Sequence, residues 1–306
     1  TTKELVSEVL ATTYITYTTY GNLNNHIGVP LTLLSIKKDA EMAVIEMGAN
    51  HQKEIASYCA YTMPTHGIIT NCGKAHLEGF GGVEGVKKGK GELFDYLRAH
   101  RGIAFINSDY DYLHELSAGI PQIIRYGEKS GDIRGEIKND TEFLEIQITR
   151  GAALPSIQTQ LVGDYNLPNL LTAICIGKTF GVPDAAIKQA LENYAPSNSR
   201  SQLINKGSNT IIMDAYNANP TSMRAAIQNF AHMEGNKKIL ILGGMMELGG
   251  ESKKEHADIV QLIRSGTWYK VVLVGSDYLD LPASMLHFNT SAEARDWFQK
   301  ENIQDA

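Results

Sequence analysis

Short apolar runs recur along the chain and are separated by longer stretches with helical spacing. The runs that are almost entirely apolar predict strands covered on both faces; they lie at residues 42–47, 67–70, 103–106, 210–213, 238–242 and 270–274. Apolar residues three and four positions apart predict helices; these cover residues 52–62, 83–98, 167–180, 183–193, 221–233 and 252–263. Because strands and helices alternate, the pattern predicts an α/β fold with mostly parallel sheets.

Residues 131–162 break this alternation, because they read as strands without helices between them. We expect them to form an antiparallel excursion at the edge of the first sheet. A polar, proline-containing stretch, Ala195–Ser199, follows a predicted helix and predicts a domain boundary. We therefore expect a larger α/β domain over residues 1–199 and a smaller, incomplete, Rossmann-like α/β domain over residues 200–306.

Several helix starts are marked by the residues that precede them. Asn219 followed by Pro220 predicts a capped helix with proline in its first turn. Ser252 and Glu255 have the S-x-x-E spacing of a capping box. A helical stripe that includes Leu5 and Val9 begins almost at Thr1, where a free chain end normally frays, so we expect the chain to be cut from something longer.

Composition narrows the classes of partner and compartment. The 306 residues carry 28 Lys and Arg against 34 Asp and Glu, a net charge of −6, which argues against a general nucleic-acid or anionic-membrane binder. No apolar run reaches the ~18 residues of a membrane span, and no signal-peptide pattern opens the chain. Three cysteines without a CxxC pair suit a reducing compartment. We expect a cytoplasmic protein that binds no nucleic acid and does not insert into a membrane.

Polar side chains follow the predicted parallel strands at their carboxyl ends, where open α/β sheets bind ligands. Glu46 interrupts an apolar strand, and His76 lies in a loop rich in glycine. Together a carboxylate and an imidazole could hold a divalent metal ion. Each also has a simpler explanation: Glu46 could cap a helix or pair with a lysine, and His76 could face solvent. Asp214 and Glu247 follow two later strands.

Two further stretches carry candidate chemistry. Lys90 is flanked by Gly89 and Gly91 in a lysine-rich helix, which indicates either a solvated basic face or a lysine that meets phosphate or is modified. Glycine is unfavourable inside a helix, so this pair suggests close backbone packing. Asn166 and Asn169 stand at a helix start, where they could cap the helix or bind the edge of an adenine.

Six strings, taken in order, resemble the Mur ligase family. They are residues 20–30 (YGNLNNHIGVP), 44–51 (VIEMGANH), 75–80 (AHLEGF), 88–94 (KGKGELF), 214–220 (DAYNANP) and 246–249 (MELG). The GNLNN and EMGAN strings resemble the member of the family that adds D-alanyl-D-alanine. The resemblance extends from residue 1 to about residue 260.

The resemblance implies an ATP-dependent amide-bond ligase of peptidoglycan synthesis. In such enzymes ATP phosphorylates the terminal carboxylate of UDP-N-acetylmuramoyl-tripeptide, and the amine of D-alanyl-D-alanine attacks the acyl phosphate. The cofactors implied are ATP and Mg²⁺, and the domains implied are a central ATP-binding domain followed by an acceptor-binding domain.

Positions that match the family motifs imply roles for individual residues. Glu46, His76 and Lys90 would hold magnesium, with Lys90 as a carbamate formed with carbon dioxide. The remaining matches are the substrate residues Asn22, Asn24, Asn25, Tyr216, Asn217 and Asn219, and the ATP-binding residues Asn166, Asn169, Arg200 and Asp214.

The sequence also departs from the family pattern. The phosphate loop G-x-x-G-K-[ST] would precede Thr1, the family's Gly-Arg reads Ser199-Arg200, and its Gly-Asp-Met reads 244–246 (GMM). We therefore expect a chain truncated at both ends and inactive alone. The alternatives are another Mur-type or folylpolyglutamate-synthase-like ligase, or a non-catalytic nucleotide-binding relative.

Overall fold

The computed structural model describes residues 1–139, 143–197, 199–235, 237–301 and 303–306. The chain divides into two compact units. The first unit contains residues 1–72 and 80–195, and the second unit contains residues 73–79 and 196–306. Asn198, within the stretch predicted as a boundary, lies outside the described residues.

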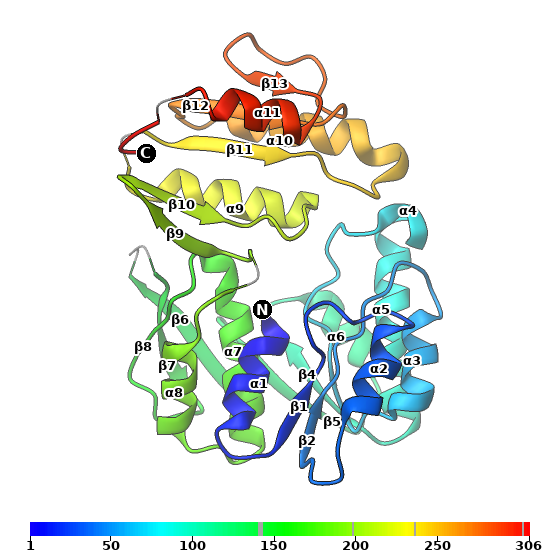
Figure 1. Cartoon of the computed structure of the whole chain (residues 1–306). Coiled ribbons are helices and arrows are strands. Elements are labelled where there is room, and N and C mark those ends of the chain that lie inside the picture. The colour runs from blue at the N-terminus through cyan, green and yellow to red at the C-terminus, as the bar shows by residue number, and fades with distance from the viewer. Residues whose placement is uncertain (140–142, 198, 236, 302) are drawn as a thin grey trace. The chain divides into compact units, whose positions relative to one another are not determined.

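The first unit is built on a six-stranded sheet with strand order β3-β4-β5-β6-β7-β8 (Figure 1). Its strands are β3 (His66–Ile68), β4 (Ile103–Asn107), β5 (Gln122–Gly127), β6 (Ile133–Asn139), β7 (Glu145–Arg150) and β8 (Ile157–Gln158). Pairing is parallel from β3 to β6 and antiparallel from β6 to β8. This confirms both the α/β fold and the antiparallel excursion at the sheet edge, although residues 140–142 of the predicted stretch 131–162 lie outside the described residues.

Two short strands, β1 (Thr16–Thr18) and β2 (Met42–Val44), form a separate parallel pair. The prediction of a strand over residues 42–47 was therefore too long, because β2 ends at Val44. Beyond that point the backbone of Glu46 bonds a side chain instead of a strand: its N–H donates to the Thr19 hydroxyl (2.9 Å).

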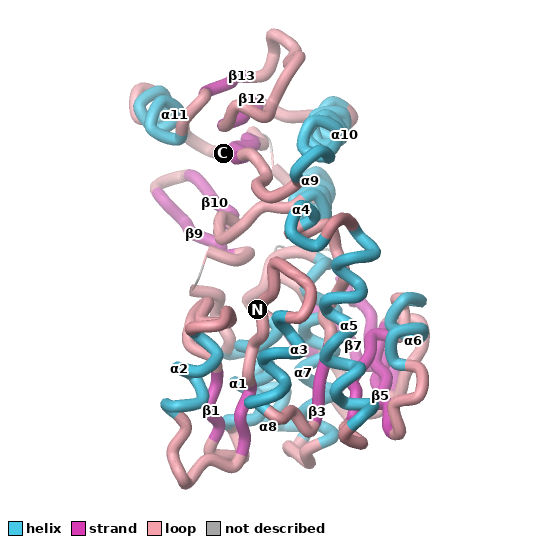
Figure 2. Tube along the Cα trace, turned by 90° about the vertical axis from the view of Figure 1, so that its right-hand side faces the viewer, coloured by secondary structure: helices cyan, strands magenta, loops and turns pink. Residues whose placement is uncertain are grey.

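Helices cover the sheet of the first unit on both faces (Figures 1 and 2). They are α1 (Thr2–Ala11), α2 (Gly28–Ser35), α3 (Glu54–Thr62), α5 (Val83–Ala99), α6 (Asp111–Ser117), the 3₁₀ turn η1 (Asp164–Asn166), α7 (Leu167–Thr179) and α8 (Asp184–Asn193). α7 packs on β4, β5 and β6, with α1 and α8 packed against it, while α5 packs on β3 and β4. The short helix α4 (Leu77–Phe80) starts in the second unit's residues and ends in the first's.

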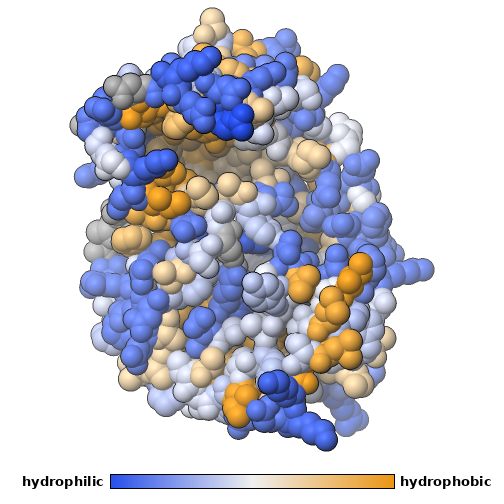
Figure 3. Space-filling view, viewed as in Figure 1, coloured by the Kyte–Doolittle hydropathy of each residue, from blue (hydrophilic) through white to orange (hydrophobic). Residues whose placement is uncertain are grey.

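The predicted apolar stripe on α1 is part of a large apolar core of the first unit. Leu5 and Val9 are fully buried, as are Leu170 and Ile174 on α7. By contrast, α2 is apolar on most of its faces and leaves Leu34 exposed, and Figure 3 shows an apolar stripe over this part of the molecule.

The second unit contains two sheets within its described residues. β9 (Gln202–Lys206) and β10 (Asn209–Met213) form an antiparallel hairpin, and β11 (Ile239–Gly243), β12 (Lys270–Val274) and β13 (Leu286–Phe288) form a parallel sheet. The sequence predicted the strands now seen as β10, β11 and β12. It missed β9 (QLINK) and β13 (LHF), because neither contains the long continuous apolar run that identified the other strands.

The helices of the second unit are α9 (Pro220–His232), the 3₁₀ turn η2 (Gly249–Glu251), α10 (Ser252–Arg264) and α11 (Ser291–Phe298). The predicted cap of α9 is confirmed, since the Asn219 side chain accepts the Ser222 N–H (3.0 Å). The predicted capping box of α10 was wrong, because the Ser252 hydroxyl donates to Asp277 (3.0 Å) and Glu255 forms an ion pair instead. Across the described residues, no helix has the length and apolar character needed to cross a membrane.

Candidate active site

Glu46 is held by two side chains of the first unit. Its backbone N–H is fixed by the buried Thr19, and its carboxylate Oε1 accepts a hydrogen bond from the Asn24 amide (2.7 Å). The side chain is half-buried. The simpler alternatives for Glu46 do not occur, because its described partners are an amide and a hydroxyl and not a lysine or a helix N-terminus. The structure therefore presents one oriented carboxylate just beyond the end of β2.

The three asparagines of the GNLNN string have different surroundings in this structure. Asn24 orients Glu46, and its carbonyl accepts the Gly48 N–H (2.7 Å). A Cβ on Gly48 would lie 2.8 Å from Asn24 Cγ, so this approach requires glycine. Asn25 Oδ1 accepts the N–H groups of Ile27 (3.1 Å) and of Gly28, the first residue of α2 (2.9 Å). Asn22 is exposed. Only Asn24 is brought into contact with another candidate residue.

Lys90 lies on α5 and is half-buried. Its Nζ donates to the Asn71 carbonyl (2.6 Å). Burial lowers the pKa of Lys90, which increases the fraction of neutral amine, the form that attacks carbon dioxide. The flanking Gly89 is buried, and a Cβ there would lie 2.3 Å from Phe80 Cε1. The close packing expected from the glycines is therefore present, and Lys90 does not lie on a fully solvated face.

His76 belongs to the second unit, where its Nδ1 bonds the carboxylate of Glu247. Both residues have a left-handed backbone, with φ of 55° for His76 and 62° for Glu247. Side-chain-bearing residues adopt this conformation infrequently, and it persists where surrounding contacts enforce it. His76 is therefore not a solvent-facing loop histidine. Its imidazole is half-buried and is paired with a carboxylate.

Arg200 and Tyr216 form a cation–π pair in the second unit, with the guanidinium carbon 3.8 Å from the ring centroid. Asp214, which directly follows β10, accepts a hydrogen bond from the Ser201 N–H at 3.4 Å. Although Asp214 is exposed, desolvation of its carboxyl by surrounding atoms raises its pKa, and Arg200 and the Ser201 N–H only partly offset this. The other two candidate residues of the DAYNANP string bond locally: Asn217 accepts the Ala218 N–H (2.9 Å), and Asn219 caps α9.

Asn166 and Asn169 form a linked pair at the start of α7. The Asn166 amide, which is buried, donates to the Val162 carbonyl (2.9 Å), and Asn169 donates to Asn166 Oδ1 (3.0 Å). Asn169 Oδ1 also accepts a hydrogen bond from Thr2 (2.5 Å). Neither amide forms a side-chain cap on α7, so the capping alternative was wrong for Asn166.

The structure thus brings some candidate residues into contact and assigns others to different units. It pairs Asn24 with Glu46, Arg200 with Tyr216, and Asn166 with Asn169. Glu46 and Lys90 belong to the first unit and His76 to the second. In the part of the chain that the structure describes, no three His, Cys, Asp or Glu side chains cluster as a ready metal site. Carboxylate and carbamate oxygens are nevertheless ligands that Mg²⁺ prefers, so the donor chemistry of Glu46 and Lys90 fits that ion.

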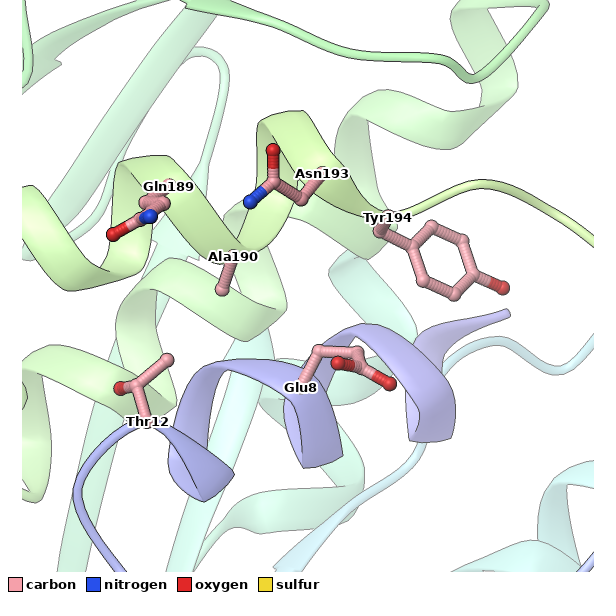
Figure 4. Close-up of a pocket in the computed structure, with 6 residues that line it drawn as sticks. All are labelled: Glu8, Thr12, Gln189, Ala190, Asn193 and Tyr194. Carbon is pink, nitrogen blue, oxygen red and sulfur yellow. The ribbon is translucent and has the colours of Figure 1, made fainter.

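The sequence did not identify the positioning residue Thr19 or a groove in the first unit. Thr19, which orients the backbone of Glu46, belongs to no motif, and nothing in its sequence context distinguishes it. A groove of about 340 Å³ lies between α1 and α8, and Figure 4 shows its lining side chains. They are Glu8, Thr12, Gln189, Ala190, Asn193 and Tyr194. None of the candidate site residues contributes to this groove.

Comparisons with known proteins agree on one family. A profile of the Mur ligase middle domain matches residues 1–177, and one of the Mur ligase glutamate ligase domain matches residues 199–302. The UDP-N-acetylmuramoyl-tripeptide–D-alanyl-D-alanine ligase of Escherichia coli is 36% identical over 285 residues, which cover 89% of this chain and 61% of that protein. The chain spans about six tenths of the length of the curated relatives it matches.

Solved structures show the same likeness. A crystal structure of MurF from Acinetobacter baumannii matches with a TM-score of 0.89 at 32% identity and covers 97% of this chain and 66% of that one. A MurF ligase from Thermotoga maritima in complex with ADP matches with a TM-score of 0.87 at 23% identity, over 98% of this chain and 71% of that one, which shows a shared fold.

Proposed function

The chain belongs to the Mur ligase family, and we propose that it acts as an ATP-dependent ligase that joins D-alanyl-D-alanine to UDP-N-acetylmuramoyl-tripeptide. The observation that carries this proposal is the contact between Asn24 and Glu46, because it couples the two strings, GNLNN and EMGAN, that resemble this member of the family. The E. coli relative at 36% identity carries that activity in its name.

Charge neutralisation is the task we assign to Glu46, His76 and Lys90. Glu46 offers an oriented carboxylate, and the lowered pKa of Lys90 favours its conversion to an anionic carbamate, which places oxygen where an ammonium would repel a cation. Mg²⁺, when bound by these residues, would neutralise phosphate oxygens. His76, held by Glu247, completes the proposed set.

ATP binding is assigned to four residues. Asn166 and Asn169 would meet the adenine, Arg200 the phosphates, and Asp214 the ribose. The raised pKa of Asp214 supports its role, because an exposed carboxylate that lacks strong donors gains most from a ribose hydroxyl that donates to it. Tyr216 supports Arg200 by stacking, which orients the guanidinium before any phosphate arrives.

The substrates are assigned to the remaining candidates. Asn22, Asn24 and Asn25 would face the UDP-linked substrate, and Tyr216, Asn217 and Asn219 the acceptor side. We also propose that residues 1–199 form the ATP-binding domain and residues 200–306 the acceptor-binding domain. Formation of an acyl phosphate from the tripeptide carboxylate, followed by attack of the dipeptide amine, would then release phosphate and form the amide bond.

The test is product formation by the protein as isolated from its source. We expect ATP, Mg²⁺, UDP-N-acetylmuramoyl-tripeptide and D-alanyl-D-alanine to yield the pentapeptide product with release of phosphate. Glu46→Gln should lower the rate at least about 100-fold. Glu136→Gln, which changes an exposed glutamate of β6, is the matched control and should leave the rate unchanged.

Substrate choice separates the alternatives. Diaminopimelate, lysine and glutamate should not replace D-alanyl-D-alanine as acceptor. Product with one of these acceptors alone would instead assign the chain to another Mur-type or folylpolyglutamate-type ligase. Nucleotide binding without product from any acceptor would identify a non-catalytic relative.

A further inference from the structure

Residues 73–79 pack with the second unit, although the chain on both sides of them belongs to the first unit. This segment carries His76. Leu77 is the single buried residue of this segment, so burial of apolar side chains contributes little to holding the segment in position. Polar contacts must therefore do much of this work.

Besides His76, Lys74 and Glu78 of the segment form hydrogen bonds with the rest of the second unit. The Lys74 N–H donates to the Thr221 hydroxyl on α9 (3.2 Å), and Lys74 Nζ donates to Glu255 Oε1 on α10 (2.5 Å). The Glu78 N–H donates to the Glu247 carbonyl (3.2 Å). Contacts thus lie on both sides of His76 in sequence, and Lys74 makes two of them.

The ion pair of Lys74 and Glu255 is asymmetric. The Glu255 side chain is 3% exposed, whereas that of Lys74 is 44% exposed. Glu255 lies in the first turn of α10, where the helix dipole stabilises a carboxylate. A buried carboxylate still requires a cation or several donors. α10 therefore holds the Glu255 carboxylate in a buried position, and the more exposed Lys74 pairs with it.

His76 needs such an anchor because of its backbone. Its φ of 55° lies in the left-handed region, as does that of its partner Glu247. A relaxed loop would leave this region, and the imidazole would then turn away from the Glu247 carboxylate. Lys74, two residues earlier, fixes the chain at the point where it enters this conformation.

We propose that Lys74 is a positioning residue that, through its ion pair with Glu255, sets the orientation of the His76 imidazole. The proposal rests on the proposed function in giving His76 a role in the reaction. Lys74 itself does not touch substrate or cofactor in this scheme. Its effect passes through the backbone of residues 74–76.

Nuclear magnetic resonance of the histidine rings tests the geometry without any assay of activity. Imidazole ¹⁵N–¹H correlations are recorded on the ¹⁵N-labelled full chain, and His76 is identified by the signals lost in His76→Gln. Because a carboxylate only accepts hydrogen bonds, we expect Nδ1 of His76 to carry the proton. In Lys74→Met the His76 signals should shift and the Nδ1 proton should exchange faster, while the other histidines keep their positions.

A double variant separates positioning from the cost of an unpaired buried charge. Lys74→Met alone leaves the Glu255 carboxylate without its cation, and Lys74→Met with Glu255→Gln removes that charge. We expect the double variant to regain stability but to keep the displaced His76 signals. Recovery of the wild-type His76 signals in the double variant would overturn the proposal, since it would show that only the charge mattered.

Lys138 and Glu145 supply a matched control in the first unit. This pair has nearly the same exposure, 47% for the lysine and 8% for the glutamate. Lys138→Met should therefore cost a similar amount of stability without moving the His76 signals. If Lys138→Met shifts the His76 signals as much as Lys74→Met does, the effect is general and the proposal fails.

Kinetics on the protein from its source adds a functional readout. A misplaced group can lower a rate by about 10²-fold, so we expect Lys74→Met to lower kcat about tenfold with KM for D-alanyl-D-alanine little changed, and Lys74→Arg to recover part of the loss. Unchanged His76 signals in Lys74→Met overturn the positioning role whatever the activity. Shifted signals with unchanged kcat support the positioning role and contradict the assignment of His76 to the reaction.

Discussion

At the scale of single residues, Glu46 and Asp214 show two ways in which surroundings prepare a carboxylate. Glu46 receives an amide hydrogen bond from Asn24 and is fixed at its backbone by Thr19. Asp214 has one long hydrogen bond from the Ser201 N–H. The Glu46 carboxylate is therefore oriented before a ligand arrives. The Asp214 carboxylate has few hydrogen-bond donors until a bound ligand supplies them.

The raised pKa of Asp214 gives a prediction with a defined sign. Because the folded-state pKa exceeds the ordinary value of 3.8, ionised Asp214 is disfavoured in the folded protein. The free energy of unfolding of the wild type should therefore fall relative to that of Asp214→Asn as pH rises from below 3.8 through the folded-state pKa of Asp214. At pH 7 the variant should be at least as stable as the wild type. Thermal unfolding from pH 3 to 7 without nucleotide measures this difference.

The same variant, although at least as stable at pH 7, should bind nucleotide more weakly than the wild type. Loss of a charged acceptor for a ribose hydroxyl should weaken ADP binding about tenfold, measured by titration calorimetry. A variant that is less stable than wild type at pH 7 and binds ADP equally well would contradict both parts of this prediction.

Which side chains meet at a site is the part that the sequence predicts least well. The six strings alone identify residues such as Glu46 and Lys90. Their partners come from elsewhere in the chain: Thr19 for Glu46 and the Asn71 carbonyl for Lys90. A backbone carbonyl or a single threonine leaves no signature in sequence, since these contacts depend on how strands and loops pack.

At the scale of elements, the sequence predicted the long helices better than the strands. It located the three-residue strands β2 and β3, but it missed β1, β5, β9 and β13. α5, α7, α9 and α10 lie within one or two residues of their predicted bounds. β2 stops three residues early, because the Glu46 N–H bonds the Thr19 hydroxyl. The capping box expected at α10 failed because tertiary partners, Asp277 and Lys74, outcompete the local bonds of Ser252 and Glu255.

Two glycines of α5 should respond differently to alanine. A Cβ on Gly85 would lie 1.8 Å from the Phe80 carbonyl oxygen, which cannot move without shifting the backbone. Gly85→Ala should therefore cost about 1–3 kcal/mol. A Cβ on Gly91 would meet only the flexible end of Leu116, at 3.3 Å, so Gly91→Ala should gain up to about 1 kcal/mol of helix propensity. Urea unfolding of both variants measures this contrast, and equal effects would refute the role of packing at Gly85.

The start of α8 supplies a prediction that depends on pH. Asp184 pairs with Lys178 and accepts the Ala153 N–H (2.7 Å), and the bond from Lys178 contributes most to lowering the Asp184 pKa. Asp184→Asn should cost about 1 kcal/mol at pH 7, a modest value because the pair is partly exposed.

The sign follows from a folded-state pKa below the ordinary value of 3.8. The contribution of Asp184 is complete above that value and is lost as pH falls through the folded pKa. Urea unfolding at pH 7, 5 and 3 should give a constant difference between wild type and variant at the two higher values and a smaller one at pH 3. A difference that grows on acidification would contradict the assignment.

At the scale of the whole molecule, each unit has its own core, and spectroscopy can follow them separately. Both tryptophans, Trp268 and Trp297, belong to the second unit. Tryptophan fluorescence therefore reports on that unit, while far-ultraviolet circular dichroism reports on helices of both. A substitution in one core should change the two signals unequally.

Leu5→Ala should show this, because Leu5 is fully buried in the core of the first unit. We expect a loss of about 2–5 kcal/mol, seen as an earlier transition in circular dichroism with an unchanged fluorescence midpoint in urea. Ile259→Ala, in the buried face of α10, is the matched variant of the second unit and should move the fluorescence midpoint. Equal shifts of both signals by either variant would show that the two units unfold as one.

Because residues 73–79 belong to the second unit, the protein cannot be divided into its two units by one cut. Seven residues of the second unit are encoded inside the first, so no single cut in the polypeptide yields both units intact. A fragment of residues 196–306 would leave Glu255 buried without Lys74, and a fragment of residues 1–195 would carry a seven-residue strip with nothing to bind. A split version of the protein would need the heptapeptide supplied to the second half, for example grafted onto its N-terminus. For this chain, the smallest exchangeable module is discontinuous in sequence.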